Sequence, residues 1–338
     1  MKILSVKKFV STIFILFILL FMVLLISPFI GTVDIDYHKV FDRSIPFKDN
    51  PDAVIFFKTR LPRILLAAIV GGCLACAGVI FQALLRNPLA SPYTLGISSG
   101  GSLGAVIAIH LGLTQTIFGL SYITLMSFIG AVITTLFVYL LSKKRGNISV
   151  TTLLLAGVTL NFFFAAVILF IQYISDFTQS FQMIRWMMGG LDITSYSMII
   201  GILPLILIIF IITFSLSRQL NLISIDVQTA TNLGVNVERT RTILLFITSI
   251  MTGAVVSLSG PIGFIGLIIP HILRLIIGSD HRLLIPASII SGGAFLVICD
   301  TIARIILPQT EIPVGILTAI CGGPFFLWLL IRKKNNFF

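Results

Sequence analysis

The sequence predicts an all-α, polytopic membrane protein with about ten transmembrane helices. Two observations carry this prediction: 57% of the 338 residues are hydrophobic, and only 10% are charged, whereas a soluble domain carries about a quarter charged residues. With a mean hydropathy of +1.11, the apolar residues exceed what one soluble core could bury. Most of them must therefore face lipid or other spanning segments, which excludes an ordinary water-soluble globule.

The individual spans are expected where charged residues are scarce, because a helix needs about 20 apolar residues to cross the hydrocarbon core. Six stretches hold one span each and two longer stretches hold two spans each. In chain order, the stretches are 9–33, 64–85, 87–142 with a break near Gly112 to Gly119, 146–175, 193–217, 242–277 with a break at Ser259-Gly260-Pro261, 283–299 and 312–331.

The first segment is interpreted as a retained anchor with a cytoplasmic N-terminus. It follows Lys2, Lys7 and Lys8 like a signal peptide, but its apolar run is too long and no small-x-small cleavage site follows. Ten crossings then return the C-terminus to the cytoplasm. This assignment places 15 Lys and Arg inside and eight outside, as the positive-inside rule requires. The scattered basic residues form no single face, so no nucleic-acid partner is expected.

Neither an enzyme nor a metal site is indicated by the polar residues. We identify neither an HExxH metal motif nor a GxSxG nucleophile motif, and His38, His110, His271 and His281 are scattered along the chain. Cys73-Leu74-Ala75-Cys76 has redox-motif spacing but sits in an apolar, small-residue segment, which favours helix packing. We therefore expect no catalytic residue, no bound metal and no cofactor in this chain.

An ion-driven carrier is the distant alternative. Such carriers usually place a carboxylate near the bilayer midplane, and no acidic residue falls there. The acid nearest a span, Asp300, is expected at the outer end of the ninth span, one turn before Arg304, where the two can form an ion pair.

A permease driven by separate ATPase subunits needs a cytoplasmic contact surface, and the polar segment 218–241 is the candidate. No GxxxxGK[ST] phosphate loop occurs, so ATP would be used by partner chains. The segment predicts a short helix capped by Asp226 and ended by Gly234 in the left-handed conformation, followed by a helix capped by Asn236. The alternative is a solvated connector resting on lipid headgroups.

Seven motifs support a family resemblance over nearly the whole chain, weakest before residue 55. The chain resembles the permease subunits of binding-protein-dependent ABC importers for ferric siderophores, haem and cobalamin, the FecCD type, whose members have ten spans. The motifs are RLPRILLAAIVGG (60–72), RNPLASPYTLGISSGGSLGA (86–105), LLLAGVTLN (153–161), RWMMGGL (185–191), TNLGV (231–235), GPIGFIGLIIPHILRLIIGSDHRLLIP (260–286) and EIPVGILTAICGGPFFLW (311–328).

The resemblance implies that outer arginines receive glutamates of a substrate-binding protein, and the motif match assigns this role to Arg60, Arg63 and Arg304. Independently, Pro62 suits the first turn of a helix, and two arginines at a helix N-terminus oppose the helix dipole, which an acidic partner would relieve. The alternative is interfacial arginines that reach lipid headgroups.

The remaining roles are also implied by the resemblance. Pro88 prevents helix continuation after the second span, so a tight turn is the simpler interpretation there. Asn161 is a polar residue on an otherwise apolar fifth span, and the fifth and tenth spans line the channel in this family. The implied residues are Asn87, Leu89, Ser149 and Thr151 for a cytoplasmic gate, Asp226, Thr229, Ala230, Leu233 and Gly234 for ATPase coupling, and Asn161 and Gln172 for the pathway.

The resulting expectation is a single permease domain, 1–338, in the cytoplasmic membrane. Its expected partners are a second permease subunit, either a copy or a homologue, two ATPase subunits and an extracytoplasmic binding protein. The expected substrate is an iron–siderophore complex, with haem or cobalamin as alternatives.

Overall fold

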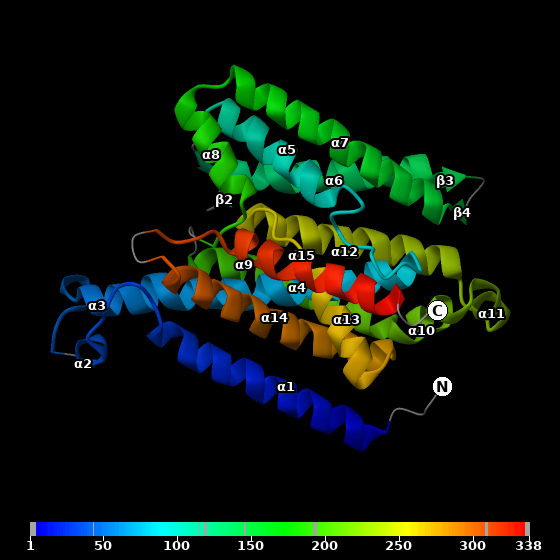
Figure 1. Ribbon diagram of the computed structural model, residues 1–338, viewed down its shortest axis with the longest axis horizontal. Helices are drawn as coiled ribbons and strands as arrows, with labels where there is room; N and C mark the ends of the chain where they lie inside the picture. Colours follow the sequence, from blue (N-terminus) through cyan, green and yellow to red (C-terminus); the bar gives the residue numbers. More distant parts are fainter. Residues whose placement is uncertain are drawn as a thin grey trace.

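Apolar helices run side by side along the long axis of the molecule (Figure 1). The computed structural model describes residues 5–42, 44–113, 115–117, 120–144, 147–191, 195–307 and 310–334. In this part of the chain seven helices are long and apolar enough to cross a membrane, and three more are apolar but shorter. Together they correspond to the ten predicted spans. Lys2, Arg43 and Arg145, which entered the charge count, lie outside the described residues.

The seven long helices are α1 (Val6–Ile26), α4 (Leu61–Leu84), α6 (Tyr122–Ser142), α7 (Val150–Ile174), α9 (Tyr196–Ser215), α12 (Val237–Ser259) and α14 (His281–Ile305). The shorter apolar helices are α5 (Ile97–His110), α13 (Ile265–Ile277) and α15 (Val314–Lys334), the last ending in Arg332, Lys333 and Lys334. The connecting elements are η1 (Ser27–Phe29), α2 (Tyr37–Val40), η2 (Phe47–Asp49), α3 (Pro51–Val54), η3 (Ile55–Arg60), α8 (Phe177–Met187), α10 (Ser217–Ile225) and α11 (Val227–Asn232), with hairpins β1–β2 (Thr116–Ile117, Leu120–Ser121) and β3–β4 (Lys143–Lys144, Asn147–Ile148).

Helix α4 forms the buried centre of the bundle, between α14, α12 and α13. Small residues allow this closeness, as the run of glycines in this span predicts: a Cβ atom on Gly71 would collide with the carbonyl of Gly292 on α14. A Cβ on Gly78 would likewise collide with the carbonyl of Gly266 on α13. The helices at the edge differ, because α1 and α7 leave most of their apolar side chains exposed.

Two features differ from the sequence prediction. Helix α4 continues a helical stretch that begins at Pro51, capped by Asn50 and passing through the π-helical segment η3, so Arg60 and Arg63 lie inside a helix rather than at its N-terminus. Helix α5 has 14 residues, because Gly96 at φ +79° starts it late. At 1.5 Å per residue such a helix is too short to cross the hydrocarbon core alone.

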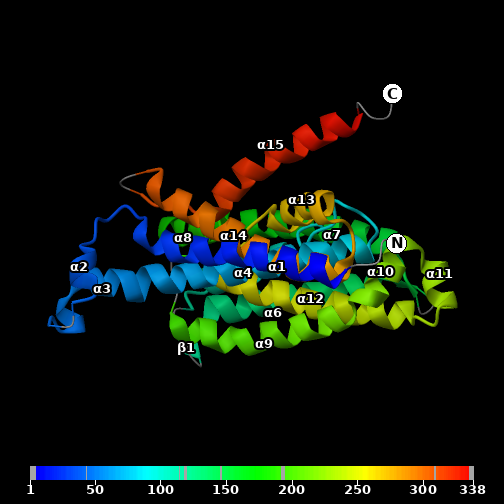
Figure 2. The ribbon, with the colours of Figure 1, turned by 90° about the horizontal axis from the view of Figure 1, so that it is seen from below.

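The C-terminal part of helix α15 stands away from the body of the molecule (Figure 2). Its first turn is attached by a hydrogen bond from the Gly315 amide to the carbonyl of Gly189, 3.1 Å long. Further along, Gly322 touches the ring of Phe264. The helix is therefore held at its N-terminal half.

Candidate functional site

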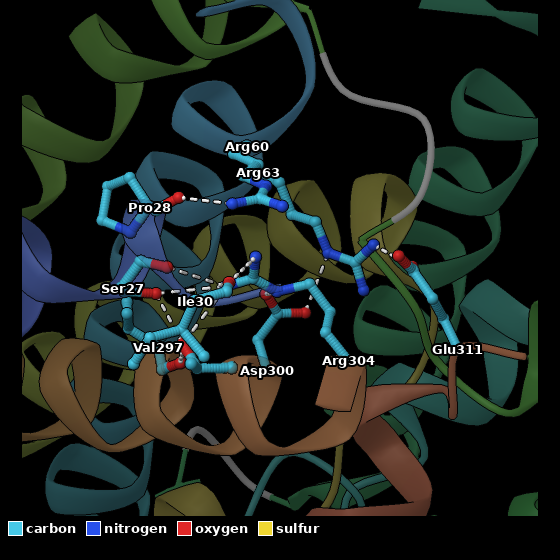
Figure 3. Close-up of polar contacts among 10 residues, drawn as sticks. Ser27, Pro28, Ile30, Arg60, Arg63, Val297, Asp300, Arg304 and Glu311 are labelled. Atoms are coloured by element: carbon cyan, nitrogen blue, oxygen red, sulfur yellow. Dashed lines mark hydrogen bonds and ion pairs between the residues drawn. The ribbon is translucent and has the colours of Figure 1, made fainter. Parts of the chain in front are cut away.

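Arg60, Arg63 and Arg304 gather at one end of the bundle, where α4, α14 and the segment after α1 meet (Figure 3). All three side chains are buried within this chain. Arg60 donates to the main-chain carbonyls of Pro28 at 2.9 Å and Val33 at 2.5 Å. The sequence grouped these residues correctly, but it did not predict that they would be buried.

Two carboxylates balance part of this positive charge. Asp300 lies between two arginines: Arg63 Nε donates to its Oδ1 at 2.9 Å, and Arg304 Nε lies 3.2 Å from its Oδ2. The predicted Asp300–Arg304 pair is thus confirmed. Arg63 Nη1 also pairs with Glu311, which lies just before α15. Arg60 and Arg63 were expected to need an acidic partner. For Arg63, this chain itself supplies two, Asp300 and Glu311.

Arg304 also fixes the segment that follows α1. Its Nη1 donates to the carbonyl of Ile30 at 3.0 Å, and its Nη2 donates to Ser27 Oγ at 3.1 Å. Ser27 Oγ in turn lies 2.5 Å from Thr301 Oγ1 on α14. These contacts join the first span to the ninth, so the cluster has a structural role whatever else it does.

A cavity of about 190 Å³ opens onto the cluster. Its lining includes all three arginines, Glu311 and the exposed Thr59. Among the described residues, the cluster holds three guanidinium groups and two carboxylates, Asp300 and Glu311, which leaves a surplus of one positive charge. In the described part of the chain Arg60 donates to main-chain carbonyls alone. The site can therefore accept one further carboxylate through charge-assisted hydrogen bonds.

The proposed gate residues lie at helix ends near the opposite end of the bundle. Asn87 and Leu89 form the predicted tight turn: the Leu89 amide donates to Asn87 Oδ1 at 2.9 Å. Ser149 caps α7 by accepting from the Thr152 amide at 3.3 Å, and Thr151 is exposed in the first turn. No hydrogen bond joins the two segments within the described residues.

Arg86, directly before this turn, is a residue that the sequence analysis did not single out. It has φ +48°, which is unfavourable for a side chain with a Cβ atom. Its Nη2 donates to the carbonyl of Ile225 at 3.3 Å. Arg86 thereby connects the turn to the last residue of α10, within the segment proposed to contact the ATPase. A contact across 139 residues leaves no local signal in the sequence.

The coupling segment has the predicted helix boundaries. Asp226 caps α11: its Oδ2 accepts from the Thr229 amide at 2.8 Å and from the Thr229 hydroxyl at 2.9 Å. These hydrogen bonds lower the pKa of Asp226. Gly234 takes φ +81°, and Asn236 caps α12 by accepting from the Arg239 amide at 3.0 Å. Helix α10, which precedes this pair, was not predicted.

The coupling helix α11 is attached on one side and free on the other. Ala230 is buried against Ile223 of α10 and Val237 of α12. Thr229 and Leu233 are exposed, Leu233 to 63%. A six-residue helix with a fixed inner face and an exposed outer face is suited to contact a second protein.

Asp280 holds α10 against the start of α14. Asn221 Nδ2 donates to Asp280 Oδ1 at 2.8 Å, and the His281 amide donates to Asn221 Oδ1 at 2.8 Å. Hydrogen bonds from the Arg282 side chain lower the pKa of Asp280 to about 2. The coupling segment is therefore anchored through charged and polar contacts to the ninth span.

The two proposed pathway residues bind their own chain. Asn161 Nδ2 donates to the carbonyl of Tyr93 at 2.7 Å, and Gln172 Nε2 lies 3.7 Å from the sulfur of Met187. Both amides thus attach α7 to its neighbours. The exposed surface of α7 is mainly apolar. Its side chains that are more than half exposed include Leu155, Phe162, Phe163, Leu169, Phe170 and Tyr173.

Two small motifs are buried inside helices. The prediction that no GxSxG motif occurs is wrong, because Gly96-Ile97-Ser98-Ser99-Gly100 has this hydrolase spacing. Ser98, however, is buried inside α5 rather than exposed on a sharp turn. Cys73 and Cys76 are free thiols buried in α4, in line with the packing interpretation.

Comparison with known proteins places the chain in context. A family model described as the FecCD transport family matches residues 18–332. The hemin transport system permease protein HmuU of Yersinia pestis is 39% identical over 95% of this chain and 95% of its own length. The cobalamin import system permease protein BtuC of Halobacterium salinarum is 41% identical over 83% of this chain and 74% of its own length.

Two further similarities cover nearly the whole chain. The iron(3+)-hydroxamate import system permease protein FhuG of Bacillus subtilis is 34% identical over 94% of this chain and 96% of its own length. A solved structure of a metal-chelate type ABC transporter in an inward-facing conformation aligns with a TM-score of 0.83 at 33% identity, over 95% of this chain and 99% of the other.

Proposed function

Because this chain belongs to the FecCD transport family, we propose that it is the permease subunit through which an ATP-binding-cassette importer moves an iron–siderophore complex across the cytoplasmic membrane. The observation that carries this proposal is the family match over residues 18–332, together with ten apolar helices. A relative named for iron(3+)-hydroxamate import supports the substrate class. Haem is the second candidate, because the relative named for hemin transport covers 95% of both chains. Cobalamin remains an alternative.

The exposed faces of α7 and α15 are proposed as the contact with a second permease subunit. Helix α7 leaves a broad apolar face uncovered, and α15 stands away from the body (Figure 2). A second copy or a homologue laid against these helices would enclose a pathway between the two subunits. The pathway wall from this chain would then be apolar, and selectivity would reside mainly in the binding protein.

Docking of an extracytoplasmic binding protein is proposed at the arginine cluster. The support is the 190 Å³ cavity and the surplus positive charge around Arg60 and Arg304. A carboxylate entering from the outside would find donors already held in place by the surrounding carbonyls.

Two ATPase subunits are proposed to act on this chain and its partner through α11. Movement of the ATPase would press on Thr229 and Leu233, which the outer face of α11 presents. Ala230 would transmit it to α10 and α12, and Arg86 would transmit it to the turn at Asn87. This chain performs no chemistry on the substrate.

Uptake measured in a strain that lacks the gene tests the substrate. Cells are supplied with radioactive iron bound to a hydroxamate siderophore, or with haem or cobalamin, before and after the gene is restored. We expect restoration of siderophore-iron uptake alone. Restored uptake of haem or cobalamin without iron uptake would reassign the substrate within the same family.

A further inference from the structure

We propose that Glu311 is a built-in competitor for the carboxylate that docks at the arginine cluster, and that its ion pair with Arg63 latches the start of α15 to α4. When a docking carboxylate takes the place of Glu311 on Arg63, the latch opens and docking is signalled to the tenth span. This inference rests on the proposed docking site.

The two carboxylates on Arg63 differ in how easily they can leave. Asp300 is fully buried, while the Glu311 side chain is 44% exposed and reaches Arg63 from the cavity mouth. Separating a buried ion pair leaves an uncompensated charge, whereas a carboxylate at the surface regains water when it leaves. Asp300 is therefore the permanent partner and Glu311 the exchangeable one (Figure 3).

On Arg63 itself, exchange of Glu311 is favoured over binding of a third carboxylate to the same guanidinium group. Glu311 lines the same cavity as the three arginines, so an incoming carboxylate reaches Arg63 beside it. Three carboxylates around one guanidinium group would repel one another at short range. The incoming group relieves this repulsion by taking the position of Glu311.

Glu311 lies close to the start of α15, so its release from Arg63 would affect this helix. Glu311 lies three residues before α15, and its side chain ties this segment to α4. The segment has separate main-chain anchors: the Ile312 amide donates to Ala303 O at 3.3 Å and the Gly315 amide to Gly189 O at 3.1 Å. Loss of the Glu311 ion pair would therefore loosen the segment before α15 without detaching the helix, whose C-terminal part stands away from the body (Figure 2).

A test without any partner uses the full-length permease in lipid nanodiscs and measures hydrogen exchange of the amides in residues 310–316. Glu311→Gln removes the latch. Thr59→Glu places a permanent carboxylate in the cavity, one helical turn from Arg63, and Thr59→Gln is its matched neutral control. We expect both Glu311→Gln and Thr59→Glu to speed exchange in this segment by about threefold or more, as loss of an ion pair predicts. Thr59→Gln should exchange like the unmodified protein.

Exchange that is unchanged in both Glu311→Gln and Thr59→Glu would overturn the latch. A second measurement, docking affinity of the cognate binding protein in solution, separates the latch from the docking site. Glu311→Gln should bind about threefold more tightly, because the competitor is gone. Weaker or equal docking by Glu311→Gln, with docking abolished by Arg60→Glu, would overturn the latch alone. Unchanged docking by Arg60→Glu would overturn the docking site itself.

Discussion

Replacing Asp300 with Asn tests whether the arginine cluster is held by a buried charge. The Asp300 side chain has no exposed surface, and it lies against Arg63 and Arg304, whose side chains are 7% and 4% exposed. Removing one partner of such a buried network leaves uncompensated positive charge on two buried guanidinium groups. The expected cost is about 3–5 kcal/mol of unfolding free energy.

The matched control is Glu311→Gln, which removes a carboxylate from the same arginine at a partly exposed position. It should cost less than about 1 kcal/mol. Both variants are measured by unfolding the purified protein in mixed micelles with increasing SDS. If Asp300→Asn is no more destabilising than Glu311→Gln, the argument from burial is refuted. As a second check, the cost of Asp300→Asn combined with Arg304→Gln should be smaller than the sum of the two single costs, because the stranded charge is then removed.

Three further predictions concern the core and the coupling segment. Gly78→Leu should prevent the approach of α4 to Gly266 and abolish stable folding, seen as loss of monodisperse protein in size-exclusion chromatography, while Gly201→Leu, in open space, should be tolerated. Asp226→Ala should remove the cap of α11, at a cost of about 1 kcal/mol, and should lower the amount of substrate transported per ATP hydrolysed. The control Asp226→Asn keeps a hydrogen-bond acceptor and should keep most of the coupling. Equal transport per ATP in the two variants would contradict this role. The carboxyl of Asp280 has a folded pKa of about 2, below the unfolded value of about 3.9, so its stabilising contribution is present above about pH 4 and is lost as the pH falls toward 2. Over this range the protection of the α10 amides, corrected for the pH dependence of the intrinsic exchange rate, should fall, and Asp280→Asn should remove that dependence. An identical pH profile in the variant would count against the anchor.

Features that depend on neighbouring residues could be predicted from the sequence. The caps at Asp226 and Asn236 and the left-handed Gly234 were found because a cap is formed by residues only a few positions apart. The Asp300–Arg304 pair was found for the same reason, since four residues make one helical turn. The spans were found because the lack of charge is itself a local property.

Features that depend on contacts between distant segments could not be predicted. Arg63 meets Asp300 across 237 residues, and nothing near either residue indicates the other. The burial of Arg63, and with it its structural role, depends on that distant contact. Glu311 was identified only as the first residue of the motif at 311–328, with no partner assigned to it. The start of the second helix at Pro51 was missed because the charged residues Asp52 and Lys58 were taken to mark a loop, although Asn50 provides a helix cap.

We propose that this chain forms the membrane pathway of an importer driven by ATP hydrolysis in partner subunits. The most direct measurement is substrate uptake into sealed vesicles that contain the permease, its ATPase subunits and its binding protein. Uptake should require ATP on the side of the membrane where the ATPase subunits lie. It should persist when the proton and sodium gradients across the membrane are abolished. Uptake that proceeds without ATP and follows an ion gradient would contradict the account.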